Sequence, residues 1–279
     1  MATTLVRRPG RAEVDPNAAR RRWTVTKAVL GISVPVAFVA LWQIAATAGW
    51  IDRFLYPAPS RLASAAMEIL EDGRLVDATL VSLRRVLLGY ALGATAGLVV
   101  GFVMGMSRVV RAALEPFSWG WYTVPKLALL PVFLTIFGFG ETAVVVLIAV
   151  TVYFFVWISV MSAVMAVPTG YREAAIMLRA NRWEMFRHVL LPAALPEIFV
   201  GLRIAAGVAV LMLVGIEFVI SDAGLGYLIE QGRTLLLLEQ SYVGIIVVAV
   251  LGYVFALLVK LVGRLLIRWT AEDNAIVPT

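Results

Sequence analysis

The chain of 279 residues has no cysteine and a single histidine, His188. Without cysteine there is no disulfide framework and no thiol nucleophile. One histidine cannot build a zinc site of His and Cys ligands. A Ser-His-Asp triad would have to use His188, which lies in a basic segment away from any predicted pocket. These absences argue against a hydrolase and against a metal centre.

Lysine is also scarce, and a phosphate-binding loop is missing. Such a loop ends in Gly-Lys-Ser or Gly-Lys-Thr, so that backbone N–H groups and the lysine hold the phosphates. None of the three lysines, Lys27, Lys126 and Lys260, follows a glycine. We therefore predict that the chain is not an enzyme and binds no cofactor, and that any ATP is hydrolysed by another polypeptide.

Charged residues make up 15% of the chain and hydrophobic residues 61%, against about 25% and about 45–50% in ordinary globular domains. The apolar excess lies in long runs, which predicts an all-α membrane protein and not a large soluble core. The net charge of +6 does not indicate nucleic acid, because arginines flank the apolar runs. The expected spans, six in all, cover about 27–50, 81–106, 118–137, 142–167, 195–220 and 241–269.

The domain organisation follows from these spans. Residues 1–26 are expected to form a flexible basic tail, 27–269 one transmembrane domain with a loop at 168–192, and 270–279 a short second tail. Lysine and arginine are counted to set the orientation. One side would carry Arg7, Arg8, Arg11, Arg20, Arg21, Arg22, Lys27, Arg108, Arg111, Arg172, Arg179, Arg182, Arg187, Lys260, Arg264 and Arg268. The other would carry Arg53, Arg61, Arg74, Arg84, Arg85 and Arg233. The side with more lysine and arginine is predicted to be cytoplasmic, so both termini and the 168–192 loop are expected there. Arg84 and Arg85, on the other side, run against this positive-inside rule.

Ionisable residues within the spans are few. Pro125 and Pro131 are expected to interrupt the third span. Lys126 lies between them, where it either contacts a gate or solute or extends to the interface. Glu217 lies near the outer end of the fifth span, either as a gate residue or as a group bonded to nearby backbone. These four residues are the pore and gate candidates. An ion-coupled carrier would normally keep an acid near the midplane, and none is found there.

Glycines recur every four residues along the second span, at Gly89, Gly93, Gly97, Gly101 and Gly105. Small residues at this spacing let two helices approach closely in lipid. The partner is either another helix of the same bundle or a helix of a second subunit.

The 168–192 loop is basic and amphipathic. Asn181 followed by Glu184 has the spacing of a capping box, which predicts one helix ending near 178–180 and a second beginning at Arg182. Pro168 and Pro192 are expected to separate this unit from the spans. Its apolar face either lies on anionic lipid or docks in a groove of a partner.

The loop resembles the EAA loop of binding-protein-dependent ABC importer permeases. Glu173-Ala174-Ala175 is followed after three residues by position 179, and after nine more by the 189–192 segment Val-Leu-Leu-Pro. The segments 82–89, 124–131, 137–140 and 224–229 are similar to the nitrate, sulfonate and taurine branch of that family.

The resemblance implies a permease subunit in the bacterial cytoplasmic (inner) membrane, with the loop between the fourth and fifth spans acting as a coupling helix. It implies a homodimer, a cytoplasmic ATPase dimer that binds ATP-Mg, and an extracytoplasmic binding protein that delivers a small, anionic, sulfonate-, nitrate- or taurine-like solute. The residues expected to couple to the ATPase are Glu173, Ala174, Ala175, Arg179, Asn181, Trp183, Arg187 and Pro192. Those expected to face the binding protein are Gly224, Gly226 and Tyr227.

One residue departs from the family pattern. Arg179 stands where the family has glycine, which serves where the backbone turns with positive φ. Because asparagine tolerates that conformation better than most residues, we expect Arg179 to stay helical and the break to lie at Ala180–Asn181. Two other functions stay open from the residues alone: a secondary solute carrier, and a membrane assembly protein that transports nothing.

Overall fold

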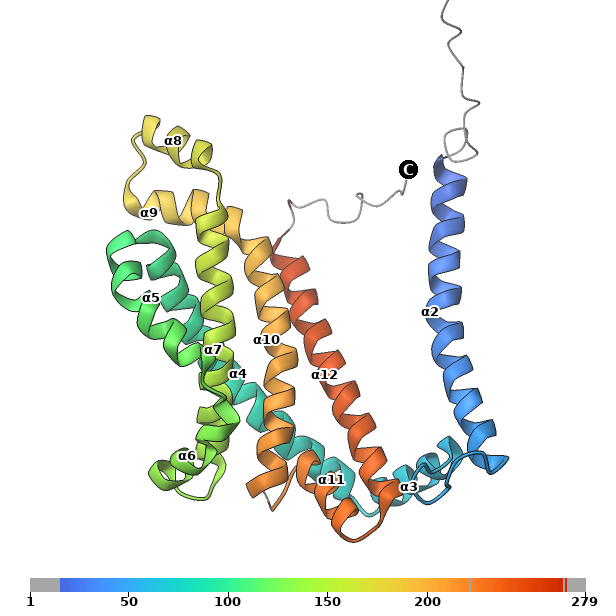
Figure 1. Cartoon of the computed structure of the whole chain (residues 1–279). Helices are drawn as coiled ribbons and strands as arrows, with labels where there is room; N and C mark the ends of the chain where they lie inside the picture. The colour runs from blue at the N-terminus through green and yellow to red at the C-terminus, as the bar shows by residue number, and fades with distance from the viewer. Residues whose placement is uncertain (1–15, 221, 268, 270–279) are drawn as a thin grey trace, which may run out of the picture. The chain divides into compact units, whose positions relative to one another are not determined.

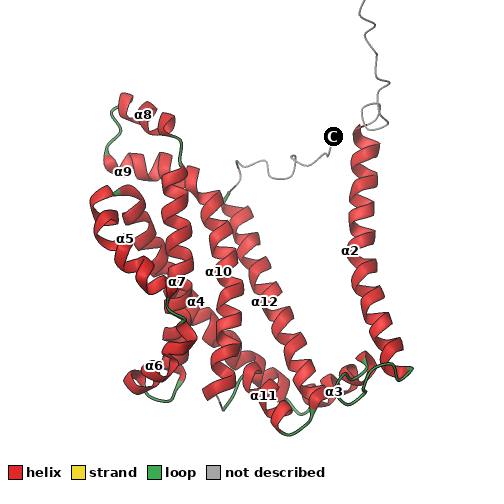
Figure 2. Ribbon diagram, in the orientation of Figure 1, coloured by secondary structure: helices red, strands yellow, loops and turns green. Residues whose placement is uncertain are grey.

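The structure is a computed structural model that describes residues 16–220, 222–267 and 269, and all their side chains except those of residues 16–22, 24 and 28. Within these residues every regular element is a helix (Figure 2), which confirms the predicted all-α class. The chain divides into two units, residues 1–61 with 271–279, and residues 62–270. Each unit is described by itself.

The first unit contains α2 (Pro16–Thr47), whose 25–47 part is long and apolar enough to cross a membrane. The structure differs from the predicted flexible tail at residues 16–26, which form the first turns of α2. Proline at the first helical position and the alanines and arginines that follow favour a helix. The remaining tail residues, 1–15 and 270–279, lie outside the described part of the chain. Gln43 accepts from Ser60 N at 3.1 Å and joins the end of α2 to the start of α3.

The second unit is built on four long helices (Figure 1). They are α4 (Arg74–Met106), α7 (Glu141–Ala166), α10 (Leu191–Ile220) and α12 (Leu238–Leu266). With α2, the described part of the chain has five helices long and apolar enough to cross a membrane, or six if one bent helix pair counts as a span. The helix α3 (Pro59–Glu71) precedes α4.

The bent pair contains the predicted third span at 118–137, and the break lies at Pro125, one of the two prolines expected to interrupt that span. The helix α5 (Arg108–Thr123) meets the segment formed by η1 (Lys126–Leu129) and α6 (Leu130–Phe137) at 86°. Val124 between them is extended, with φ −67° and ψ 127°. The cause is Pro125, because a proline disfavours helical geometry in the residue before it and cannot continue the hydrogen-bond ladder.

The closest helix pair is α4 and α7, and the glycine stripe makes this approach possible. A Cβ at Gly89 would lie 2.6 Å from Ile148 Cγ2, and one at Gly101 would lie 2.7 Å from Val160 Cβ. The other three stripe glycines, Gly93, Gly97 and Gly105, meet α7 in the same way. The stripe therefore faces a helix of its own chain, and α7 fills the face that could have met a second subunit.

Short helices cover the two ends of this bundle (Figure 1). At one end lie α8 (Thr169–Met177), α9 (Arg182–Glu184) and the π-helix η2 (Met185–Leu190), which leads into α10. At the opposite end lie α6 and α11 (Leu225–Thr234). Each end carries residues that the sequence marks as functional candidates.

Candidate functional site

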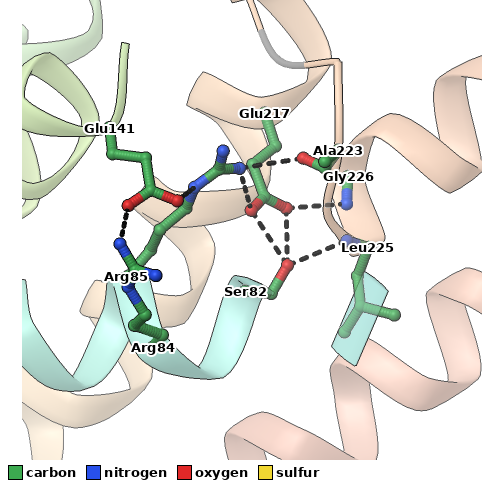
Figure 3. Close-up of polar contacts among 8 residues, drawn as sticks. All are labelled: Ser82, Arg84, Arg85, Glu141, Glu217, Ala223, Leu225 and Gly226. Carbon is green, nitrogen blue, oxygen red and sulfur yellow. Dashed lines mark hydrogen bonds and ion pairs between the residues drawn. The ribbon is translucent and has the colours of Figure 1, made fainter. Parts of the chain in front are cut away.

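Glu217 lies in the last turn of α10 and is almost completely buried, with 1% of its surface exposed. Its carboxylate is held from three sides (Figure 3). Ser82 Oγ of α4 donates to it, with distances of 2.9 and 2.8 Å to the two oxygens. The backbone N–H of Gly226 donates from 2.8 Å. Glu217 is thus the hydrogen-bonding centre of the α11 end of the bundle, and its bond to a nearby backbone N–H is one of the two arrangements expected for it.

Arg85 completes the charge balance of this buried site. Its Nη1 lies 3.0 Å from Glu217 Oε1 and also donates to the carbonyl of Ala223 at 2.8 Å. A buried carboxylate is strongly disfavoured unless a cation and hydrogen-bond donors compensate it. Ser82 and Arg85 project from α4, so one buried acid links α4 to α10 and to the segment before α11.

The same arrangement gives Arg84 and Arg85 acidic partners, Glu141 and Glu217. Arg84 forms an ion pair with Glu141 at the start of α7 (Figure 3), and Arg85 Nε lies 4.0 Å from the same carboxylate. Both arginines therefore face acids within the protein. The unusual arginine pair was the signal in the sequence that could have revealed this site, which sequence reasoning missed apart from Glu217.

Gly224 and Gly226, predicted to face a binding protein, contact the Glu217 side chain. Both are buried against the Glu217 side chain, where Gly224 has φ 110° and a Cβ at Gly226 would lie 2.5 Å from Glu217 Cβ. Their lack of a side chain is what lets the backbone reach the carboxylate. Tyr227, the third residue of that set, is half-buried.

The other gate candidates gather at the bend between α5 and η1. Lys126 Nζ donates to the carbonyls of Trp121, at 3.0 Å, and Tyr122. It lies 4.7 Å from the centre of the Phe154 ring. The ammonium thus satisfies the end of α5, whose last carbonyls have no helical partner. Pro125 and Pro131 flank η1 and are exposed.

At the opposite end of the bundle, α8 closes with a Schellman motif. Arg179 N donates to Ile176 O at 2.9 Å and Ala180 N donates to Ala175 O at 3.0 Å. This motif places one residue in the left-handed region, and that residue is usually glycine. Here it is Arg179, with φ 57°.

The expectation that Arg179 stays helical is therefore wrong. The break runs over residues 178–181, so it includes the predicted pair Ala180–Asn181 but begins earlier. The reason is that Asn181 is already used as the N-cap of α9. An N-cap residue needs extended backbone, and Asn181 has φ −74° and ψ 172°. The left-handed residue must then come before it.

The predicted capping box is present. Asn181 Oδ1 accepts from Trp183 N and Glu184 N at 3.0 and 2.9 Å, and Glu184 Oε2 accepts from Asn181 N at 2.8 Å. These bonds begin a helix that continues through η2 and α10 without interruption, from Arg182 to Ile220.

Pro192 does not separate the loop from the span, contrary to expectation. The N–H of Leu191 donates to Phe186 O, a wider π-type pairing. A proline removes one α-helical bond and crowds the carbonyl four residues before it, and a π-turn is a recognised way to pass such a position. Phe186 also packs edge-on against Phe102 of α4, at 5.3 Å between ring centres.

The residues expected to couple to an ATPase differ in their solvent exposure. Glu173, Ala174, Trp183 and Arg187 are exposed, as are Arg179 and Asn181. Ala175 is buried, with 7% of its surface exposed. Arg172 links the loop to the bundle by donating to Val164 O of α7 at 2.7 Å.

Loss of the cap gives a test of this local geometry. We expect Asn181→Ala to destabilise the loop by about 1 kcal/mol, the usual cost of losing an N-cap side chain. Proteolysis of residues 178–181 should then be faster, while Asn181→Asp or Asn181→Ser should behave as the natural protein does. Equal cleavage of the alanine variant would contradict a structural role for the capping box.

A known protein family matches most of the chain. The family described as "Binding-protein-dependent transport system inner membrane component" matches residues 93–271, which contain both candidate sites except for the start of α4. The chain belongs to this family. As such it is a multi-pass protein of the inner membrane and a permease component, like the relatives described next.

Individual relatives extend the match over most of the chain. The aliphatic sulfonates transport permease SsuC of Bacillus subtilis is 33% identical, covering 86% of this chain and 87% of the relative. The taurine transport system permease TauC of Escherichia coli is 32% identical, covering 90% and 94%. The nitrate import permease NrtB of Synechococcus elongatus is 33% identical, covering 67% and 68%.

Solved structures share the fold. An inward-facing form of the MetNI methionine ABC transporter has a chain that matches with a TM-score of 0.57 and 21% identity, covering 70% of this chain and 95% of that one. An amino acid ABC transporter crystallised with histidines matches with a TM-score of 0.55 and 20% identity, covering 73% and 97%. At this identity the likeness concerns the fold alone.

Proposed function

We propose that the chain is the membrane-spanning permease of an ABC importer for a small anionic solute of the sulfonate, taurine or nitrate type. The named relatives support the solute class. The observation that carries the coupling role is the continuous helix from Arg182 to Ile220. It begins in the exposed loop at one end of the bundle and reaches the Glu217 cluster at the other.

The topology that goes with this proposal has six spans, with the bent pair α5 and η1–α6 counted as one. The loop 168–192 and both termini are cytoplasmic, because the end of the bundle that carries the loop also carries most of the arginines. The α11 end is then extracytoplasmic. The Glu217 cluster holds that end together, next to the surface where a solute-binding protein would dock.

The working complex is proposed to contain two copies of this chain and two copies of an ATPase that binds ATP-Mg. When the ATPases close on ATP, they draw the two 168–192 loops together. The unbroken helix from Arg182 transmits this motion as a rigid body, so that the inner and outer ends of the path open in turn. Glu173, Ala174, Trp183 and Arg187 provide the exposed part of the contact.

Co-expression with the ATPase and binding protein tests the proposal. The purified complex in proteoliposomes is expected to hydrolyse ATP faster when solute-loaded binding protein is added, and to accumulate a sulfonate, taurine or nitrate. Solute uptake driven by an ion gradient without ATP would instead support a secondary carrier. A complex that neither stimulates ATP hydrolysis nor moves any of these solutes would refute the proposed function.

A paired substitution tests the coupling residues. We expect Glu173→Lys with Ala174→Asp to abolish co-purification of the ATPase, because a charge reversal and a new acid would face the same docking surface. Glu71→Lys is the matched control, since Glu71 is an exposed acid at the end of α3. An unchanged ATPase complex in the double variant would show that these residues are not part of the contact.

A further inference from the structure

The ammonium group of Lys126 lies level with the middle of the long helix α7. Its Nζ is 4.7 Å from the centre of the Phe154 ring, and Phe154 is the fourteenth of the 26 residues of α7. At 1.5 Å per residue, Phe154 is about 18–20 Å from either end of that helix. The charge is therefore held far from both ends of a helix that is long enough to span the membrane. Ionisable groups at such a depth are costly to insert and generally mark a solute or ion pathway.

No acid of the described chain balances this charge. Lys126 is the only basic residue in the stretch 112–171, which includes α6, α7 and most of α5. Among the residues that the structure describes it forms no ion pair. A charge away from bulk water is strongly disfavoured unless an opposite charge accompanies it. A balancing anion must then come from outside this chain.

The break between α5 and η1 leaves Lys126 accessible. Val124 is extended and the two helical segments meet at 86°. Pro125 and Leu127 on either side are exposed, and Lys126 itself is half-buried. Non-helical backbone at membrane depth is tolerated only where it is buried in protein or lines a water-filled cavity. Discontinuous helices of this kind form the solute sites of many membrane transporters.

We propose that Lys126 binds the anionic group of the solute halfway along the path. The proposal rests on the proposed function and names the residue that recognises the negative charge. An ammonium group has three N–H donors, and two of them hold the carbonyls of Trp121 and Tyr122. The third is available to an oxygen of a sulfonate or a nitrate. The rings of Tyr122 and Phe154, at 5.2 and 4.7 Å, keep water away and so strengthen the contact between cation and anion.

A purely structural role does not account for a charge at this position. A neutral donor or a water molecule can satisfy the last carbonyls of a helix without the cost of desolvating a cation. Lys260 shows the ordinary placement of a lysine in a span. It lies in the last two turns of α12, where a long side chain can reach the membrane interface.

A neutral substitution distinguishes the charge from the fold. Lys126→Gln keeps a donor for the carbonyls of α5 and loses the cation. In proteoliposomes that contain the complete transporter, solute uptake per ATP hydrolysed is expected to fall about tenfold or more, because an ion contact away from bulk water is stronger than one at the surface. The melting temperature should stay close to that of the natural chain. Lys260→Gln is the matched control and should leave uptake unchanged.

The absence of cysteine allows the charge to be restored chemically. Lys126→Cys places a single thiol in this chain. Its thiolate attacks 2-aminoethyl methanethiosulfonate, methanesulfinate leaves, and the new disulfide carries an ammonium group. Uptake should be as low as in Lys126→Gln, recover with this reagent, and stay low with 2-sulfonatoethyl methanethiosulfonate, which adds an anion. The natural chain treated in the same way controls for thiols of the other subunits.

Three outcomes would count against the proposals. If Lys126→Gln takes up solute at the natural rate, the inference is overturned while the proposed function stands. It is also overturned if the aminoethyl group restores nothing, or if uptake, ATP hydrolysis and melting temperature fall together, because the side chain then serves the fold. If the complex with the natural chain transports no sulfonate, taurine or nitrate, the proposed function itself fails.

Discussion

Glu217→Ala is expected to destabilise the folded protein by about 3–5 kcal/mol, the cost of leaving the partner of a buried ion pair uncompensated. Arg85 is 5% exposed and would keep its charge without the carboxylate. The hydroxyl of Ser82 and the N–H of Gly226 would lose the same acceptor. The yield of monodisperse protein and its denaturation midpoint in detergent measure the effect.

Two further variants distinguish the loss of charge from the loss of side-chain volume in this cluster. Glu217→Gln keeps the size and part of the hydrogen bonding but leaves Arg85 unpaired, so it should recover only part of the loss. Glu217→Leu combined with Arg85→Met removes both charges and should be more stable than Glu217→Ala alone.

Glu141→Gln is the surface control, because an ion pair with an exposed partner contributes about 0–1 kcal/mol, and the Glu141 side chain is 41% exposed. If Glu217→Ala and Glu141→Gln had equally small effects, the buried pair would not stabilise the fold.

Gly93→Ala is expected to have the second largest effect, a loss of at least about 1–3 kcal/mol from overpacking. The new Cβ would overlap the carbonyl oxygen of Ala149 and approach Val152 Cβ to 2.8 Å. Backbone cannot rotate away as a side chain can, so α4 and α7 would have to separate. Thermal unfolding of the purified protein measures the cost.

The control for Gly93 is Gly120→Ala in α5. A Cβ at Gly120 meets no atom within 4 Å, and replacing a helical glycine by alanine stabilises by about 0.5–1 kcal/mol when there is space. The two substitutions are chemically identical and should have opposite signs. A neutral Gly93→Ala would mean that α4 and α7 are not packed as closely as described.

Local signals in the sequence predicted local structure well. The capping box at Asn181 and Glu184 depends on residues three positions apart, and the glycine stripe depends on a fixed spacing in one helix. Both could be read before any fold was known. The bend at Pro125 was also readable, but its angle of 86° was not, because the angle depends on how α5 and α6 pack against the rest of the bundle.

The Glu217 cluster could not be predicted in the same way. Ser82 and Arg85 lie 135 and 132 residues before Glu217, and nothing in one sequence pairs positions so far apart. The prediction that Arg179 stays helical failed for a different reason. Asparagine tolerates a left-handed backbone, but it is also a preferred N-cap residue, which needs an extended backbone. At Asn181 the N-cap requirement prevailed.

The Glu217 cluster also limits how this protein can change over time. Its acid, its cation, its hydroxyl and its two glycines come from α4 and from the α10–α11 region, so each is useful only if the others are present. A replacement of Glu217 or Arg85 alone passes through a chain with an unmatched buried charge. We infer that these positions are inherited together, and that an exchange of segments between two related permeases succeeds only when α4 and the α10–α11 region come from the same parent.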